Sequence, residues 1–102
     1  MRTLLVFALL CYSQIANAIT LNHGECMALA VWGHDVLLIR DVGGDKDKLH
    51  SKISELAQTR PHLKVLLRFY ENLWKSEMDY QGLATVMYQD CINRRGEYGD
   101  DI

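Results

Sequence analysis

The stretch PHLKVLLRFYENLWK, residues 61–75, decides the fold because it has the pattern of a helix that is apolar around most of its circumference. At about 100° per residue, its aliphatic and aromatic side chains form a broad arc, and only a strip of charged and amide side chains remains for solvent. Helices of this kind lie at the centre of a core. Pro61 suits the first helical position, so we expect the helix to begin there, preceded by Arg60 or Thr59.

An N-terminal helix is expected over 25–41, and it is apolar almost all round. Such a helix is either central to the core or covered by a partner. The run Val36–Ile39 could instead form a strand, since short apolar runs fit both periods, and this alternative stays open at the sequence level. Gly43 and Gly44 follow and are typical of a helix terminus.

Two further helices are expected, over 45–58 and 77–93. The first has a narrow apolar stripe, and Asp45 or Asp47 can cap it, so we expect it on the outside of the domain. The second follows a capping signal at Ser76, and Gly96 is a suitable stop. Within it, Asp90 is expected to form an ion pair with Arg94, one turn further on.

The first eighteen residues have the pattern of a signal peptide. A short positive start and an apolar run lead to Ala16-Asn17-Ala18, and this predicts cleavage after Ala18. Cys11 would leave with this segment, because no small residue precedes it as lipid attachment requires. The expected location is therefore periplasmic or secreted, with no stable membrane anchor.

The two remaining cysteines, Cys26 and Cys91, are then expected to form a disulfide in an oxidising compartment. In an up-and-down arrangement, the start of the first helix and the end of the last lie at the same end, where the two cysteines can meet. The predicted fold is all-α: a small antiparallel four-helix bundle closed by Cys26–Cys91. Its domain covers 19–96, after the signal peptide at 1–18 and before a polar tail at 97–102.

Charge and motifs exclude several function classes. The net charge of −2 is unlike that of a nucleic-acid-binding protein, which would be strongly basic. The four histidines, His23, His34, His50 and His62, contain no pair at the i, i+4 spacing of a helical metal site, and we expect no metal and no cofactor. No activated nucleophile is recognisable, so the sequence does not predict an enzyme.

The excess of large apolar residues on the first and third helices indicates an interaction surface. We take Trp32, Ile39 and Trp74 as its candidate residues, either exposed or at the interface of a homodimer.

The layout of the chain resembles small exported two-cysteine helical proteins of Gram-negative bacteria and their phages. The matching residues are Cys26, Ala28, Ala30, Arg40-Asp41-Val42-Gly43, Tyr70, Ser76, Tyr88 and Cys91. The segments RPHLK (60–64) and YQDCIN (88–93) are also similar to segments of the spackle-type periplasmic proteins of phages, although the spacing around the first cysteine differs. The second resemblance implies inhibition of a phage-tail lysozyme.

These observations lead to two functional hypotheses. The first is a non-catalytic periplasmic module that binds another periplasmic protein, for example a cell-wall lytic enzyme that it inhibits. The second is an acid-stress chaperone of the small two-cysteine type, which would open between about pH 2 and 4 as its carboxylates become protonated.

Overall fold

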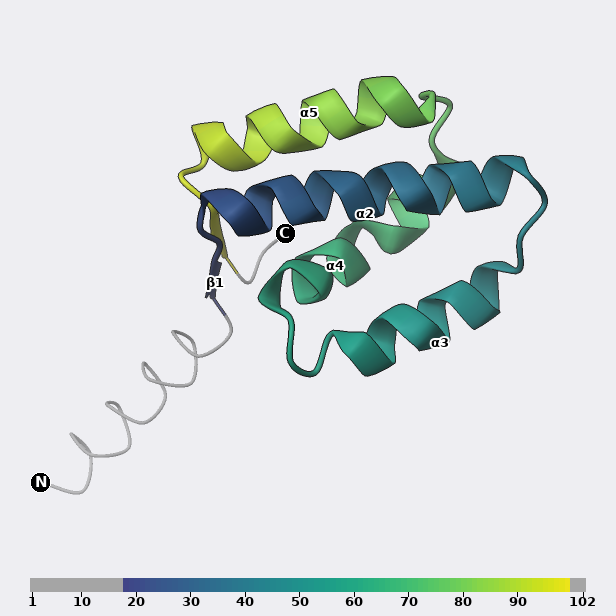
Figure 1. Ribbon diagram of the computed structural model, residues 1–102, viewed down its shortest axis with the longest axis horizontal. Coiled ribbons are helices and arrows are strands. Elements are labelled where there is room, and N and C mark those ends of the chain that lie inside the picture. Colours follow the sequence, from purple (N-terminus) through teal and green to yellow (C-terminus); the bar gives the residue numbers. More distant parts are fainter. Residues whose placement is uncertain (1–17, 100–102) are drawn as a thin grey trace, which may run out of the picture.

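The computed structural model describes residues 18–99, which form four helices and a short two-stranded sheet (Figure 1). In chain order, the elements are β1 (Ile19–Thr20), α2 (His23–Asp41), α3 (Lys46–Leu56), α4 (Pro61–Lys75), α5 (Tyr80–Asn93) and β2 (Glu97–Tyr98). Successive helices run in alternating directions, as Figure 1 shows. The predicted antiparallel four-helix bundle is therefore confirmed, and the segment Val36–Ile39 is helical, which excludes the strand alternative. The predicted signal peptide lies, apart from Ala18, outside the described residues.

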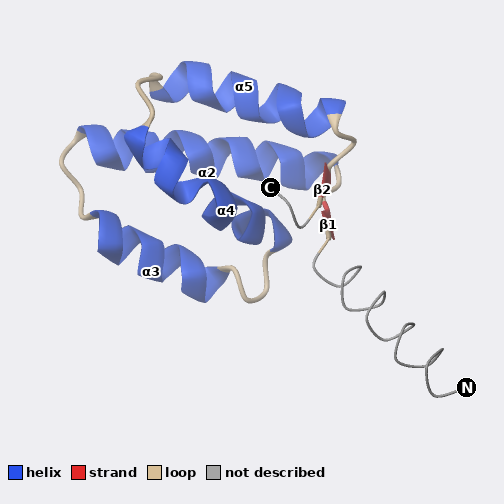
Figure 2. Ribbon diagram, turned by 180° about the vertical axis from the view of Figure 1, so that it is seen from behind, coloured by secondary structure: helices blue, strands red, loops and turns tan. Residues whose placement is uncertain are grey.

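The helices pack in the order α5, α2, α4 and α3 (Figures 1 and 2). Helix α2 lies between α5 and α4, and this position explains why it is apolar on so many sides. Helix α3 packs on α4, where Ile53 is fully buried.

The hydroxyl of the buried Tyr70 donates a hydrogen bond of 2.6 Å to the carbonyl oxygen of Lys46, and this contact fixes the start of α3 against α4. Burial and the nearby carboxylates of Asp47, Glu71 and Asp45 raise the pKa of Tyr70 to about 12.

The contact between α2 and α5, called the α2/α5 contact below, is close and covalently fixed. The predicted disulfide is present: the Cα atoms of Cys26 and Cys91 are 5.7 Å apart, and both side chains are buried. Further along the helices, a Cβ atom at Gly33 would lie only 2.3 Å from the sulfur of Met87. A glycine at this position therefore allows the side chain of Met87 to lie directly on the backbone of α2.

The predicted helix starts need two corrections. Helix α2 begins at His23 rather than 25, because Asn22 and Glu25 form a reciprocal capping box with bonds of 2.8 and 3.0 Å. Helix α5 begins at Tyr80 rather than 77. Its cap is Asp79, which accepts a bond from the backbone of Gly82, whereas Ser76 bonds the backbone of Met78 in the preceding turn.

Two other helix starts agree with the sequence. The side chain of Asp45 caps α3, and Pro61 is the first residue of α4. Helix α3 ends at Leu56, slightly earlier than expected.

The prediction of a polar tail from residue 97 is wrong at its first two residues. Glu97 and Tyr98 form β2, which pairs antiparallel with Thr20 and Ile19 of β1, and the ring of Tyr98 is buried in the core. Gly96 makes this return possible with a φ of +73°, and a side chain there would collide with the carbonyl oxygen of Leu21. The folded domain thus extends beyond 96, and residues 100–102 lie outside the described part of the chain.

Candidate interaction surfaces

The three residues proposed as an interaction surface are half-buried. Trp32 of α2 and Trp74 of α4 pack against the core, and the Trp74 ring stacks on Tyr70 with their centroids 6.0 Å apart. Ile39 lies over the turn after α2, where its side chain touches the position that a Cβ of Gly44 would occupy. The more exposed large apolar side chains are others: Met27, Val31, Leu38, Val42, Met78, Val86 and Ile92.

A groove with a mostly apolar lining separates α4 from α5. The apolar lining consists of Phe69, Leu73, Leu83, Val86, Met87 and Tyr98, and the enclosed volume is about 300 Å³. The polar side chains Asn72, Ser76 and Asp90 also line it. We call this site the α4/α5 groove. It exists because α5 packs on α2 and makes little contact with α4.

The titratable groups of the α4/α5 groove are Asp90, which forms an ion pair, and Tyr98, whose phenol is neutral. The carboxylate of Asp90 accepts a bond of 2.8 Å from the guanidinium of Arg94, which confirms the predicted ion pair. The same guanidinium lies 5.0 Å from the centre of the Tyr98 ring. Burial, and to a lesser extent the charge of Asp90, raises the pKa of Tyr98, so its phenol is neutral.

A second apolar surface lies on the outer side of α2 and α5. Its residues are Met27, Val31 and Leu38 of α2 and Ala84, Thr85, Tyr88 and Ile92 of α5, and we call it the α2/α5 face. Val31 is 57% exposed, and a shallow hollow of about 320 Å³ lies between the two helices. Sequence reasoning missed this surface, because the helical pattern shows that α2 is apolar all round but not which sides are covered.

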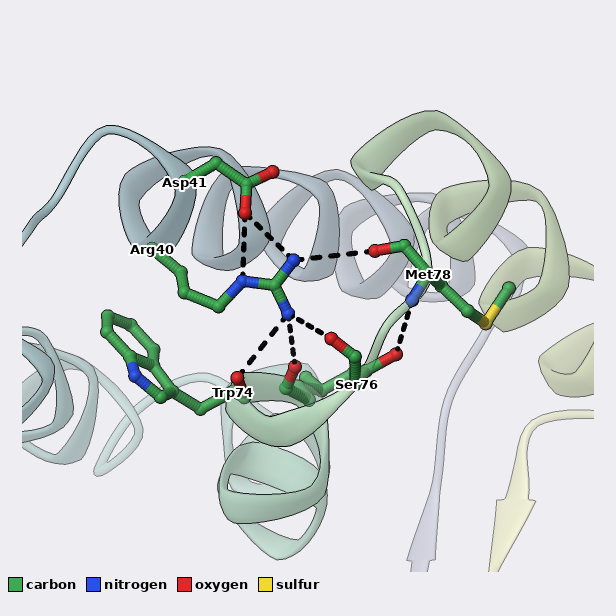
Figure 3. Close-up of polar contacts among 6 residues, drawn as sticks. Arg40, Asp41, Trp74, Ser76 and Met78 are labelled. Atoms are coloured by element: carbon green, nitrogen blue, oxygen red, sulfur yellow. Dashed lines mark hydrogen bonds and ion pairs between the residues drawn. The ribbon is translucent and has the colours of Figure 1, made fainter.

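Arg40 connects the end of α2 to the turn between α4 and α5 (Figure 3). Its guanidinium donates to the carbonyl oxygens of Leu73, Trp74, Ser76 and Met78, with all but the very short Ser76 bond between 3.3 and 3.4 Å. Asp41 holds the guanidinium in place through bonds of 2.8 and 2.9 Å. The side chain is 18% exposed and satisfies carbonyl groups that the end of α4 leaves free, so its role is structural.

The four histidines lie at separate places. His34 contacts the carboxylate of Asp35 at 3.0 Å, His23 lies 3.3 Å from the hydroxyl of Tyr88, and His50 packs edge-on against Tyr70. The Nδ1 atom of His62 is buried and has no hydrogen-bond partner within residues 18–99. Burial lowers the pKa of His62; the Arg60 charge acts in the same direction, and Glu25 opposes it.

Two absences apply to the described residues. Between residues 18 and 99, no group of three or more histidine, cysteine or acidic side chains is placed to hold a metal ion. In the same part of the chain, none of the helices combines the length and the apolar character that spanning a bilayer requires.

Comparison with known proteins gives no relative: no family model, curated protein or solved structure matches this chain. A proposal for the function therefore rests on the surfaces of the protein itself.

Proposed function

We propose that the chain is a non-catalytic, exported protein-binding module, and that the α4/α5 groove receives an apolar side chain of its partner. The observation that carries this proposal is the apolar lining of a groove that includes an accessible residue, Val86, which is 52% exposed. Apolar pockets of this kind hold the anchoring residues of protein partners.

The polar side chains of the groove suit the backbone of a bound segment. Asn72 can both donate and accept hydrogen bonds, and Ser76 can do the same through its hydroxyl. Asp90, in contrast, is already paired with Arg94, and the phenol of Tyr98 is neutral. The groove therefore offers hydrogen bonds and apolar contact but no free nucleophile or base, which supports binding rather than catalysis.

The groove is held rigidly on one side. Because the disulfide and the Gly33–Met87 contact fix α5 on α2, an incoming side chain meets a wall that is already in place. Such preorganisation reduces the entropy lost on binding.

The partner we propose is a cell-wall lytic enzyme, which the chain would inhibit. The resemblance of residues 60–64 and 88–93 to spackle-type proteins supports this choice. Residues 88–93 include Asp90, which lines the α4/α5 groove, so the second of these segments contributes to the proposed binding site.

The test is inhibition of a muramidase on purified peptidoglycan by the oxidised protein and its Val86→Lys variant. We expect inhibition by the wild type and a loss of at least about tenfold in the variant, because a lysine in the groove would bring a charge against apolar groups. Val42→Lys is the matched control, since Val42 is 75% exposed at the end of α2 and lines neither surface.

Two outcomes would contradict the proposal. Equal inhibition by wild type and Val86→Lys would remove the groove as the binding site. If no muramidase is inhibited and a photo-crosslinker at position 86 captures no more protein from periplasmic extract than one at position 42, the binding function itself is wrong.

A further inference from the structure

We propose that the α2/α5 face binds the same face of a second copy of this chain, so that the protein is a reversible, two-fold symmetric dimer. This surface is separate from the α4/α5 groove, and the inference does not depend on the proposed function.

The first argument is the distribution of charge. Helix α5 contains one charged residue in fourteen, Asp90, and that side chain lines the α4/α5 groove on the other side of the helix. No charged residue lines the hollow of the α2/α5 face. By comparison, five of the eleven residues of α3 are charged.

The lack of charge in this hollow restricts the kind of surface that a partner can offer. Complementary surfaces pair opposite charges, so a partner for the α2/α5 face needs an uncharged apolar surface of its own. A second copy of the chain supplies one, and the two hollows bring no charges together. Asp35 of α2, which is half-exposed, is paired with His34 at 3.0 Å. An exposed methionine beside a half-buried tyrosine, with few charges, is also the composition of interface centres.

The second argument is shape. The hollow has small side chains at Ala30, Ala84 and Thr85, and the larger side chains of Met27 and Val31 stand beside it. One face therefore carries both a ridge and a depression. In a two-fold arrangement, the ridge of each copy can enter the depression of the other, as an isologous interface requires.

The size of the face sets the expected strength. Helix α2 has nineteen residues and is therefore about 28 Å long, and two helices side by side are about 20 Å wide, which gives a footprint of roughly 560 Å². Stable complexes bury about 800 Å² on each partner. A footprint below that size indicates a weak dimer whose population depends on protein concentration.

The test is sedimentation equilibrium of the oxidised protein over a wide concentration range, with two variants of the same residue type. Val31→Lys changes the α2/α5 face, and Val86→Lys changes the α4/α5 groove; the two valines are 57% and 52% exposed. We expect a monomer–dimer equilibrium for the wild type and Val86→Lys, and a Kd at least about tenfold higher for Val31→Lys.

A second variant protects the test against a folding defect. Thr85→Lys alters the same hollow from α5, and it should weaken the dimer as Val31→Lys does, while circular dichroism shows unchanged helix content. A wild type that stays monomeric at the highest concentration would overturn the proposal, as would a Val31→Lys variant that dimerises normally. If the wild type is monomeric and Val31→Lys abolishes muramidase inhibition, the face binds the enzyme instead, and the dimer is wrong.

Discussion

The two long sides of α5 are held in different ways. Towards α2, a disulfide joins Cys26 to Cys91, and Met87 lies on the backbone at Gly33. Towards α4, a groove of about 300 Å³ remains, and Arg40 of α2 binds the turn that joins the two helices. A helix that is anchored firmly on one side therefore need not be packed on the other, and this leaves apolar surface available for a partner.

The largest effect is expected from removing the disulfide with Cys26→Ala and Cys91→Ala together. The two cysteines are 65 residues apart, and a loop of this length corresponds to a loss of about 4 kcal/mol in the free energy of unfolding, measured by urea denaturation. Because α5 depends on the α2/α5 contact, its amides should lose protection from hydrogen exchange more than those of α4. Equal loss in both helices would show that the α4 side holds α5 as well.

A smaller effect is expected from Arg40→Ala, which releases the turn between α4 and α5 from the end of α2. The change leaves the carbonyl groups of Trp74, Ser76 and Met78 without their charged donor, and we expect a loss of about 2 kcal/mol in the free energy of unfolding. Arg40→Lys should recover only part of it, because an ammonium lacks the planar fork of the guanidinium.

We also predict which residues change their structure in this variant. In the Arg40→Ala variant, amide chemical shifts should change around residues 76–79 and leave the residues near the disulfide unaffected. Lys75→Ala, at an exposed site at the end of α4, is the control and should change stability by less than about 0.5 kcal/mol. Changes spread evenly over α5 would mean that its two sides are not independent.

The smallest effect on the free energy of unfolding is expected at His62. This residue lies on α4, away from both sides of α5, and serves as a reference for the effects predicted there. Its pKa in the folded protein is below the ordinary value of 6.5, so the unfolded chain takes up the proton first. This contribution to stability is complete above about pH 6.5 and is lost as the pH falls through the lower pKa of the folded state. His62→Gln should therefore flatten the pH dependence below 6.5, by less than about 1 kcal/mol because solvent screens the part-exposed ring. A variant with the same pH dependence as the wild type would contradict this.

Much of the fold could be predicted from the sequence because it depends on patterns of residues that are close together in the chain. The apolar arc of 61–75, the cap at Asp45, Pro61 at the first position of α4 and the two cysteines at matching helix ends each depend on neighbouring residues or on chain direction. These features gave four antiparallel helices and the disulfide.

The remaining features depend on contacts that no local pattern encodes. A strand of two residues has no periodicity, so the pairing of Glu97–Tyr98 was missed. The start of α5 was placed too early, since both Ser76 and Asp79 are good caps and only the tertiary position of the turn, bound by Arg40, separates them. Helical periodicity also marks Trp32 and Trp74 as apolar without showing that the core already covers them in part.

The pairing of β1 with β2 imposes an order on the completion of the fold. Ile19 stands at the start of the described residues and its partner Tyr98 near their end, so a chain synthesised from its N-terminus cannot make this contact until residue 98 has been released. Until then, the core lacks the Tyr98 ring, and Leu21 lacks the carbonyl of Gly96 to which it donates. A chain truncated before residue 96 would therefore retain all four helices yet stay open at the end where β1 and β2 pair, and in the cell it would be exposed there to proteases.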